Sequence, residues 1–283
     1  MGEKGLETIH TVIENNYAKY IDYVIVAQDK NVINDYYDDI ICCCKDNHIN
    51  VCDKSQMPSL DSDYYIAVSW RWIIDKSSNL IVLHDSLLPK YRGFAPLVNM
   101  LIHKEQQIGV TALYADDNYD RGDIIVQKSI SIKYPIRIAD AISLITKLYG
   151  QIVIELIRML INGSKIPRYQ QIEEEATYSL WRDDSDYRIN WNDSAENILQ
   201  FIFSTGYPYK GALSLLNGKE VRIIDCDIFP DVSIENRDCG KVIFCKDGNP
   251  VVVCKVGLLQ LKDIRDNNGN SILPLSRFRS RFE

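Results

Sequence analysis

One histidine, His84, lies where side chains often do chemistry. The three apolar residues before it, Ile81-Val82-Leu83, predict a short buried strand, and Pro89, Gly93 and Pro96 after it predict an irregular loop. In α/β sheets, reactive side chains gather in such loops at the carboxyl ends of strands. Because an imidazole titrates near neutral pH, it suits the transfer of a proton. A histidine by itself is more often structural, so the residues around it decide the interpretation.

The segment from His84 to Pro96, HDSLLPKYRGFAP, resembles the signature loop of the formyltransferases that use 10-formyltetrahydrofolate. A second block agrees, because GVTALY at 109–114 and DRGDII at 120–125 are similar to the family's GVT strand and Asp-x-Gly loop. His84 and Asp120 are 36 positions apart, about the family's separation. The family includes glycinamide ribonucleotide and methionyl-tRNA formyltransferases and those acting on nucleotide-linked amino sugars. The resemblance covers most of the chain and weakens after about residue 210.

The resemblance implies catalytic roles for His84 and Asp120. Formyl transfer needs a neutral amine, donors for the oxyanion of the tetrahedral intermediate, and a proton for the leaving folate nitrogen. By resemblance, His84 moves the proton, and Asp120 orients the imidazole and stabilises its charged form. Without the resemblance, Asp120 would be interpreted as a turn residue before Gly122.

The main departure from the family pattern is Val82. The family usually carries an asparagine two residues before the histidine, and its amide helps to hold the formyl oxygen. Valine cannot donate a hydrogen bond, and Asn79 is off register. Losing one oxyanion donor typically lowers the rate by about 10²–10³. The sequence therefore predicts a replacement donor (protonated His84, backbone amides after Asp116, or another side chain), a slow enzyme, or an inactive homologue.

Two stretches occupy the places where the family binds the pterin of the folate cosubstrate. One carries two tryptophans that suit a flat heterocycle, and the other is the acidic loop before Asp120, whose backbone the family uses. Both stretches also have a plain structural interpretation. The tryptophans could pack into the core, and the acidic loop could be a solvated surface loop. The predicted cosubstrate-binding residues are Ser69, Trp70, Arg71, Trp72, Ile73, Asp117, Asn118 and Tyr119. No metal is expected.

Cations and aromatic residues near the signature loop are candidates for contact with the acceptor substrate. Arginine can hold a phosphate through two hydrogen bonds, and an aromatic ring can face a nucleotide base. Surface solvation and core packing explain such residues about as often. The predicted substrate-binding residues are Ser86, Lys90, Tyr91, Arg92, Gly93, Tyr178, Trp181 and Arg182.

The pattern of elements predicts an α/β fold with a mostly parallel open sheet, a Rossmann-like formyltransferase domain, followed by a small β-rich domain. We expect strands at 23–27, 49–51, 64–68, 80–83, 108–114 and 123–130, and helices at 6–15, 38–45, 97–104 and 138–162. Later strands are expected at 212–216, 220–226, 241–245 and 250–254. Asn217-Gly218 is a hairpin signal, and Ser194 is expected to cap a helix through Ser204.

Three segments are expected along the chain. Residues 1–170 would form the catalytic domain, 171–205 a connecting segment, and 206–283 the small β-rich domain. The family opens with a strand before its first helix. This sequence begins at Gly2–Gly5, which resembles the glycine-containing turn after that strand, so the first strand is expected to be missing.

Composition narrows the class of protein. The 283 residues are 46% hydrophobic and 25% charged, as in globular proteins, and no run of 18 apolar residues or signal-peptide core is present. The net charge of −7 argues weakly against a nucleic-acid partner, and the basic cluster at 277–281 is expected to be a solvated tail. The eight cysteines form no CxxC or zinc-like spacing, which favours free thiols in a cytoplasmic protein.

The sequence leaves three functions open. The first is formylation of a nucleotide-linked amino-dideoxy sugar of surface glycans such as lipopolysaccharide, favoured by LHDSLLPKYRGFAPL, the acidic pI and the short C-terminal domain. The second is methionyl-tRNA formylation, which would favour a basic face and an intact Asn-x-His. The third is a folate- or sugar-nucleotide-binding homologue without catalysis. The resemblance also implies a homodimer through the C-terminal region, and the lack of a long apolar run predicts no membrane partner.

Overall fold

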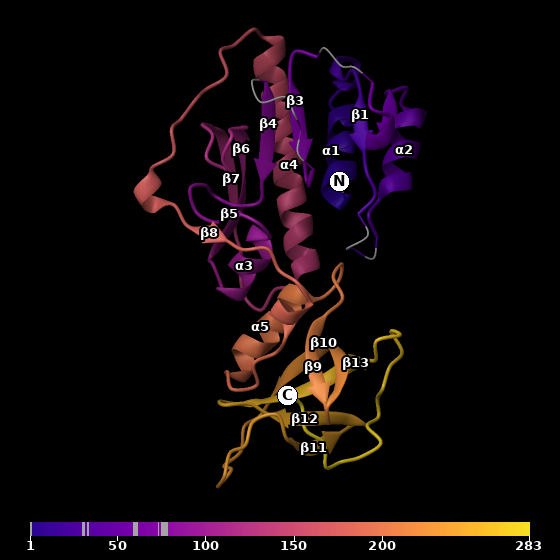
Figure 1. Ribbon diagram of the computed structural model, residues 1–283, viewed down its shortest axis with the longest axis vertical. Coiled ribbons are helices and arrows are strands. Elements are labelled where there is room, and N and C mark those ends of the chain that lie inside the picture. Colours follow the sequence, from indigo (N-terminus) through magenta and orange to yellow (C-terminus); the bar gives the residue numbers. More distant parts are fainter. Residues whose placement is uncertain (1, 30–31, 33, 59–61, 73, 75–78) are drawn as a thin grey trace. The chain divides into compact units, whose positions relative to one another are not determined.

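The computed structural model describes residues 2–29, 32, 34–58, 62–72, 74 and 79–283 (Figure 1). Contacts within the chain divide it into two compact units. The N-terminal unit comprises Met1–Leu97, Gln106–Ile132 and Asp140–Trp181, and the C-terminal unit comprises Val98–Glu105, Lys133–Ala139 and Arg182–Glu283. The domain boundaries expected at residues 170 and 205 stay predictions.

Strands and helices alternate through most of the N-terminal unit. β1 pairs with β2 and β3 with β4, both in parallel, and β4 belongs to a sheet of order β3-β4-β6-β7 in which β6 and β7 are antiparallel. The strands are β1 (Val24–Val26), β2 (Val51–Asp53), β3 (Tyr65–Val68), β4 (Leu80–His84), β5 (Arg92–Gly93), β6 (Gln107–Tyr114), β7 (Ile124–Ser131) and β8 (Tyr178–Ser179). The helices are α1 (Gly2–Glu14), α2 (Tyr37–Asp46), α3 (Pro96–Ile102) and α4 (Ile138–Ile161). The predicted α/β class is therefore confirmed, although Gly2–Gly5 forms the first turn of α1 and not a turn before it.

β6 runs antiparallel to β4. The chain between them contains the signature loop and α3, a helix of seven residues that spans about 10 Å at 1.5 Å per residue. Because the two strands are antiparallel, β6 enters the sheet beside the carboxyl end of β4, and Thr111 of β6 lies directly opposite His84 of β4.

α4 is long because its apolar residues repeat at helical spacing. Ala141, Ile145, Tyr149, Ile152 and Leu156 follow one another every three or four residues, and each is at most 1% exposed. The helix runs beside β4 (Figure 1), and the Tyr149 hydroxyl oxygen lies 3.2 Å from the Leu83 carbonyl oxygen. The predicted helix over 138–162 is thereby confirmed within one residue. Among the described residues, no helix combines the length and apolarity that crossing a membrane requires.

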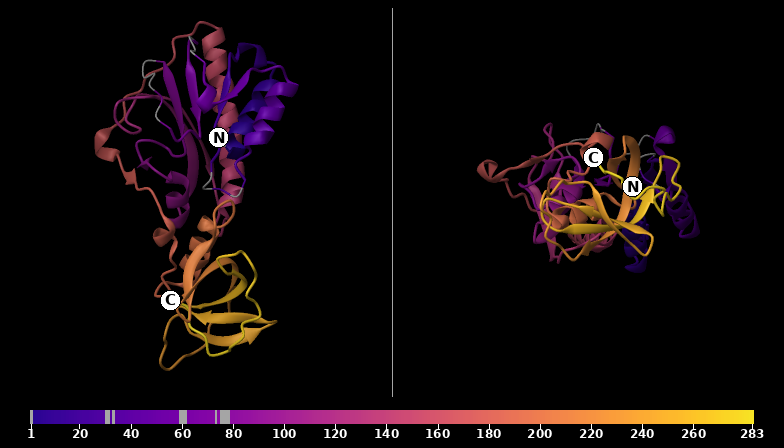
Figure 2. Two further views of the ribbon diagram at one scale, coloured as in Figure 1. Left: turned by 45° about the vertical axis from the view of Figure 1, so that its right-hand side comes forward. Right: turned by 90° about the horizontal axis from the view of Figure 1, so that it is seen from below.

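The C-terminal unit is built on one antiparallel sheet of order β11-β12-β13-β10-β9, seen in orange and yellow in Figure 2. Its strands are β9 (Ala212–Leu216), β10 (Lys219–Phe229), β11 (Val242–Lys246), β12 (Asn249–Val253) and β13 (Leu258–Arg265), and its helix is α5 (Ala195–Thr205). The Ser194 hydroxyl accepts from the Asn197 amide at 3.2 Å, as the capping prediction requires. Asn217-Gly218 turns the chain from β9 into β10 with positive φ at both residues.

β13 was not expected, yet it lies between β12 and β10 inside this sheet. Its segment, LLQLKDIR, alternates only in part, because two leucines stand together at its start. Leu258, Leu259, Leu261 and Ile264 are all fully buried. A strand covered by neighbours on both edges can therefore form where the sequence alone gives a weak period-two signal.

Candidate active site

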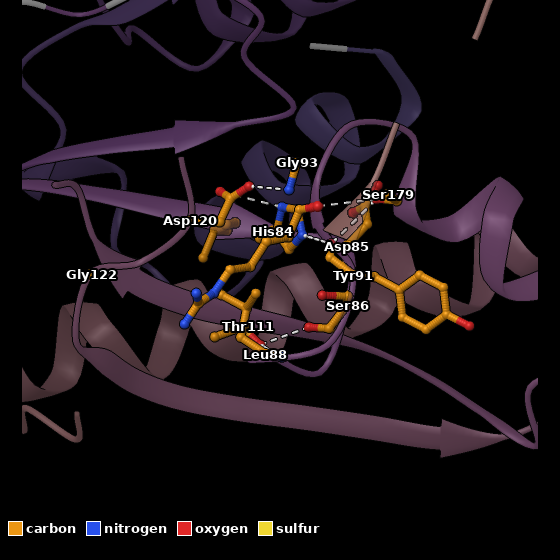
Figure 3. Close-up of polar contacts among 12 residues, drawn as sticks. His84, Asp85, Ser86, Leu88, Tyr91, Gly93, Thr111, Asp120, Gly122 and Ser179 are labelled. Carbon is orange, nitrogen blue, oxygen red and sulfur yellow. Dashed lines mark hydrogen bonds and ion pairs between the residues drawn. The ribbon is translucent and has the colours of Figure 1, made fainter. Parts of the chain in front are cut away.

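The carboxyl ends of β3 and β4 bring the candidate site together, because parallel strands end at the same edge of a sheet. His84 ends β4 and is 7% exposed. Its Nδ1 atom lies 3.5 Å from Oδ1 of Asp120, and its Nε2 atom lies 2.8 Å from the carbonyl oxygen of Tyr91 (Figure 3). The structure thus places the two residues predicted to be catalytic, which are 36 positions apart, side by side.

Asp120 is oriented by a second contact. Its Oδ2 atom accepts a hydrogen bond of 2.8 Å from the backbone amide of Gly93, while Oδ1 faces His84. Asp120 and Tyr91 both have positive φ, which non-glycine residues adopt rarely and which clusters at functional sites. When the ring of His84 is protonated, both nitrogens can donate, one to the Tyr91 carbonyl and one to Asp120. The pair is therefore suited to hold and release a proton.

Hydrogen bonds from side chains of β6 and β7 hold the signature loop against the sheet. The Thr111 hydroxyl donates to the Ser86 carbonyl at 2.7 Å and accepts from the Leu88 amide at 3.2 Å, and Gln127 donates to the Leu88 carbonyl at 2.8 Å. The Ser86 hydroxyl donates to the Lys90 carbonyl at 2.7 Å, and the residue is fully buried. Ser86, predicted to touch the substrate, therefore stabilises the loop from inside.

Arg92 is also placed differently from the expectation that it holds a substrate phosphate. It is 1% exposed, and its guanidinium donates to Gln171 Oε1 (3.1 and 2.9 Å), to Glu173 (2.8 Å) and to the Tyr178 hydroxyl (3.1 Å). Burial is tolerated because these partners satisfy the charge. The hydrogen bond from Arg92, followed by that from Arg121, lowers the pKa of the Glu173 carboxyl. The side chain of Arg92 is thus part of the scaffold.

Gly122 permits a close backbone approach beside Asp120. A β-carbon at this position would lie 1.8 Å from the Tyr114 carbonyl oxygen, a backbone atom that cannot move aside cheaply. We expect Gly122→Ala to lower the free energy of unfolding by about 3 kcal/mol, through overpacking. Thermal unfolding measures the loss. Gly206→Ala, where the nearest atom is 3.6 Å away, is the matched control, and an equal melting temperature for both variants would contradict this account.

A partly buried polar network lies at the same strand end, and no pattern in the sequence predicts it. Asp85 accepts from the Tyr149 hydroxyl at 2.5 Å, and its other oxygen pairs with Lys4 of α1. Burial, followed by the charge of Asp85, raises the pKa of Tyr149 well above its ordinary value. Nothing in the spacing of Lys4, Asp85 and Tyr149 signals the contact, since it joins three separate elements. The network fixes the residue that directly follows His84.

This network makes a prediction about alkaline stability. The raised pKa means that folded Tyr149 keeps its proton where the unfolded chain loses it. Its contribution to stability is therefore complete below about pH 10 and falls as pH rises further. We expect Tyr149→Phe to cost about 1–3 kcal/mol at neutral pH, through the lost hydrogen bond to Asp85, and to flatten the alkaline decline. Urea unfolding at several pH values checks this against Tyr169→Phe, an exposed tyrosine. Parallel pH dependence in both variants would contradict it.

The expected cosubstrate loops flank the histidine and the aspartate. Ser69 follows β3 with positive φ, and Trp70 and Trp72 pack edge to face with centroids 4.9 Å apart. The Lys54 ammonium lies 3.9 Å from the Trp72 ring centroid, and Arg71 pairs with Asp29 at 3.2 Å. Ile73 lies outside the described residues. Asp117, Asn118 and Tyr119 are exposed directly before Asp120, and the Tyr119 ring lies 5.8 Å from that of Phe94.

The remaining predicted substrate residues differ in exposure and in the unit to which they belong. Tyr91 and Gly93 enter the site through backbone atoms, as described above. Lys90, Tyr178 and Trp181 are exposed. Arg182 belongs to the C-terminal unit, where it donates to Asn99 Oδ1 at 2.6 and 3.0 Å. In the described part of the chain, no three His, Cys, Asp or Glu side chains gather as a metal ion would need.

Comparison with known proteins is consistent with this geometry. A family model described as "Formyl transferase" matches residues 54–143, and one described as "Formyl transferase, C-terminal domain" matches residues 183–281. The methionyl-tRNA formyltransferase of Thermodesulfovibrio yellowstonii is 32% identical over 229 residues, covering 79% of this chain and 71% of that protein. Another, from Syntrophomonas wolfei, is 28% identical and is covered over 63% of its length.

Solved structures share the fold. The N-formyltransferase from Helicobacter canadensis, in complex with folinic acid and dTDP-3-aminofucose, has a TM-score of 0.67 at 17% identity, covering 92% of this chain and 96% of that one. HypX from Aquifex aeolicus, in complex with tetrahydrofolic acid, has a TM-score of 0.66 at 18% identity, and this chain spans 46% of its length. At these identities the likeness concerns the fold alone. The two matched family models and the 32% identical relative show that this chain belongs to the formyltransferase family.

Proposed function

We propose that this protein transfers the formyl group of 10-formyltetrahydrofolate to the primary amine of a nucleotide-linked amino-dideoxy sugar. The observation that carries the proposal is the pairing of His84 with Asp120 at the carboxyl edge of β3 and β4. Relatives of the same fold are described in complex with folinic acid or tetrahydrofolic acid, which supports a folate cosubstrate. The exposed loop ahead of Asp120 and the tryptophan pair after Ser69 are where a planar pterin would bind.

The reaction asks three things of the side chains. The amine nitrogen forms a bond to the formyl carbon, and its proton must be removed. The carbonyl oxygen becomes an oxyanion that needs donors, and the folate nitrogen leaves with a proton. His84 can accept the first proton and return it to the leaving nitrogen, while Asp120 stabilises the charged ring. Val82 has no donor, so we assign the oxyanion to backbone amides after Asp116, which leaves one side-chain donor fewer than an asparagine at this position would give.

The acceptor assignment rests on charge. A tRNA-binding surface needs clustered cations, because phosphate contacts dominate affinity for nucleic acid. This chain has a net charge of −7. Many cations of the C-terminal unit are neutralised by carboxylates: Arg237 with Asp231, Lys241 and Arg281 with Asp238, Lys262 with Asp227, and Arg265 with Asp263. A small diphosphate acceptor needs far fewer free cations.

A second candidate is methionyl-tRNA formylation, favoured by sequence relatives of 28–32% identity that carry that name. It would require a surface on which enough cations remain unneutralised by the ion pairs of the C-terminal unit. A third is a homologue that binds folate or a sugar nucleotide without catalysis, favoured by valine at position 82. The three candidates differ in product and in the dependence of binding on salt.

One experiment separates them. Single-turnover formylation with 10-formyltetrahydrofolate is measured against dTDP- and UDP-linked amino sugars and against methionyl-tRNA, with wild-type protein and Asp120→Asn. A formylated sugar that the variant makes far more slowly supports the proposal. Formyl-methionyl-tRNA, with binding that weakens steeply with salt, supports the second candidate. Folate binding without any product supports the third.

A further inference from the structure

A segment that follows α4 in the chain pairs with the signature loop, and its contacts suggest a role in positioning. We call residues 171–179 the strap. It adds β8 in parallel to β5, and the Thr177 carbonyl accepts from the Arg92 amide at 2.9 Å. The Thr177 hydroxyl accepts from the Tyr91 amide at 2.9 Å, and the Ser179 carbonyl accepts from the Phe94 amide at 3.0 Å. The strap thus holds the loop whose Tyr91 carbonyl and Gly93 amide touch His84 and Asp120.

Gln171, at the start of the strap, contacts the aspartate loop directly. Its Nε2 atom donates to the carbonyl oxygens of Asp120 and Gly122, both at 2.8 Å. Its Oε1 atom accepts two hydrogen bonds from the buried Arg92 guanidinium. Both ends of the amide are therefore satisfied in only one orientation, since donors face carbonyls and the acceptor faces an arginine.

Arg92 anchors this amide in turn. Its guanidinium is fixed by Glu173 and by the Tyr178 hydroxyl, both within the strap. Glu173 also pairs with Arg121, the residue after Asp120. These contacts form a closed ring that runs from Asp120 through Gln171, Arg92, Glu173 and Arg121 back to Asp120. The backbone of Asp120 has a positive φ of 55°, an unfavourable conformation that this ring of contacts stabilises.

We propose that Gln171 is a positioning residue, which sets the Asp120 carboxylate against His84 through the Asp120 and Gly122 carbonyls. Catalysis of this kind is sensitive to small displacements, since a misplacement of about 1 Å can cost about 10² in rate. The rate consequence rests on the proposed function, whereas the geometric consequence does not. Gln171 touches no reacting atom, and its effect passes entirely through Asp120.

A double-mutant cycle tests the rate consequence. Gln171→Ala is expected to lower kcat by about 10–10²-fold with little change in KM for the folate, because the strap acts on the aspartate and not on the pterin. In an Asp120→Asn background, the same change is expected to alter kcat by less than about 2-fold. Gln170→Ala, at the exposed neighbouring position, is the matched control. An equal loss of kcat in both backgrounds, or a loss of melting temperature without loss of kcat, would overturn the proposal.

A second readout needs no acceptor substrate. At a pH that protonates the ring, the N–H proton of His84 that faces Asp120 is sought by NMR as a downfield resonance at low temperature and assigned by its loss in His84→Ala. Gln171→Ala is expected to shift or broaden it, and Gln170→Ala to leave it in place. Gln171→Met, which keeps the packing volume, replaces the alanine variant if that variant fails to fold. An unchanged resonance would overturn the proposal even if no acceptor is ever found, so its failure is distinct from that of the proposed function.

Discussion

Replacing His84 by alanine is expected to lower kcat for formyl transfer by about 10³-fold while leaving folate binding within a few-fold of the wild type. General acid–base catalysis by a positioned side chain contributes about 10²–10⁴ in rate. The side chain is 7% exposed, and both of its nitrogens face oxygen acceptors on the signature loop and on Asp120. The loss should therefore lie in the chemical step. Single-turnover kinetics at saturating cosubstrate measures it.

The matched control for this variant is His10→Ala. His10 lies on the exposed side of α1, where its side chain is 46% exposed and pairs weakly with Glu7. Its removal should leave kcat within about 2-fold, because exposed substitutions away from the site change little. A His84→Ala variant that folds normally and retains more than a tenth of the wild-type kcat would rule out His84 as the proton shuttle. The mechanism would then need another base.

Introducing asparagine at position 82 is expected to raise kcat by about 10²-fold. Val82 lies two residues before His84 on β4, so both side chains point to the same face of the sheet. It is paired with Ala67 on one side and Leu113 on the other, and neither of these side chains offers a hydrogen-bond donor. A single oxyanion donor is worth about 10²–10³ in rate. Pre-steady-state formylation by Val82→Asn measures the gain.

A matched substitution distinguishes the new donor from a change in the sheet. Val126→Asn places the same residue on β7, where Val126 is paired with Ala112 and, like Val82, is half-buried. Both variants should lose about 1–3 kcal/mol of stability from placing an amide in a half-buried strand. Only the first should gain activity. If Val82→Asn leaves kcat unchanged or lowers it, the oxyanion is already held by another donor, and the site has evolved around valine.

Short-range features of this protein were decided by the sequence itself. The strand before His84, the apolar stripe of α4, the cap at Ser194 and the turn at Asn217-Gly218 all depend on residues within a few positions of one another. Backbone preferences and burial patterns act over such distances, so local spacing predicts them. The His84 and Asp120 pair was predicted by resemblance, since its two motifs carry their own local signatures.

The tertiary structure alone decided which distant residues support that pair. Gln171 and Asp120 are 51 positions apart, Lys4 and Asp85 are 81 apart, and Tyr149 and Asp85 are 64 apart. Each contact joins elements whose own patterns say nothing about the partner. The same reason explains why Arg92 stabilises the loop and does not bind a phosphate as expected. A cationic side chain on an irregular loop is predicted to be exposed, but residues of the strap bury Arg92 and accept its hydrogen bonds. The segment that buries a residue is often distant from it in the sequence. Its position depends on tertiary packing and not on the local backbone preferences of the buried residue.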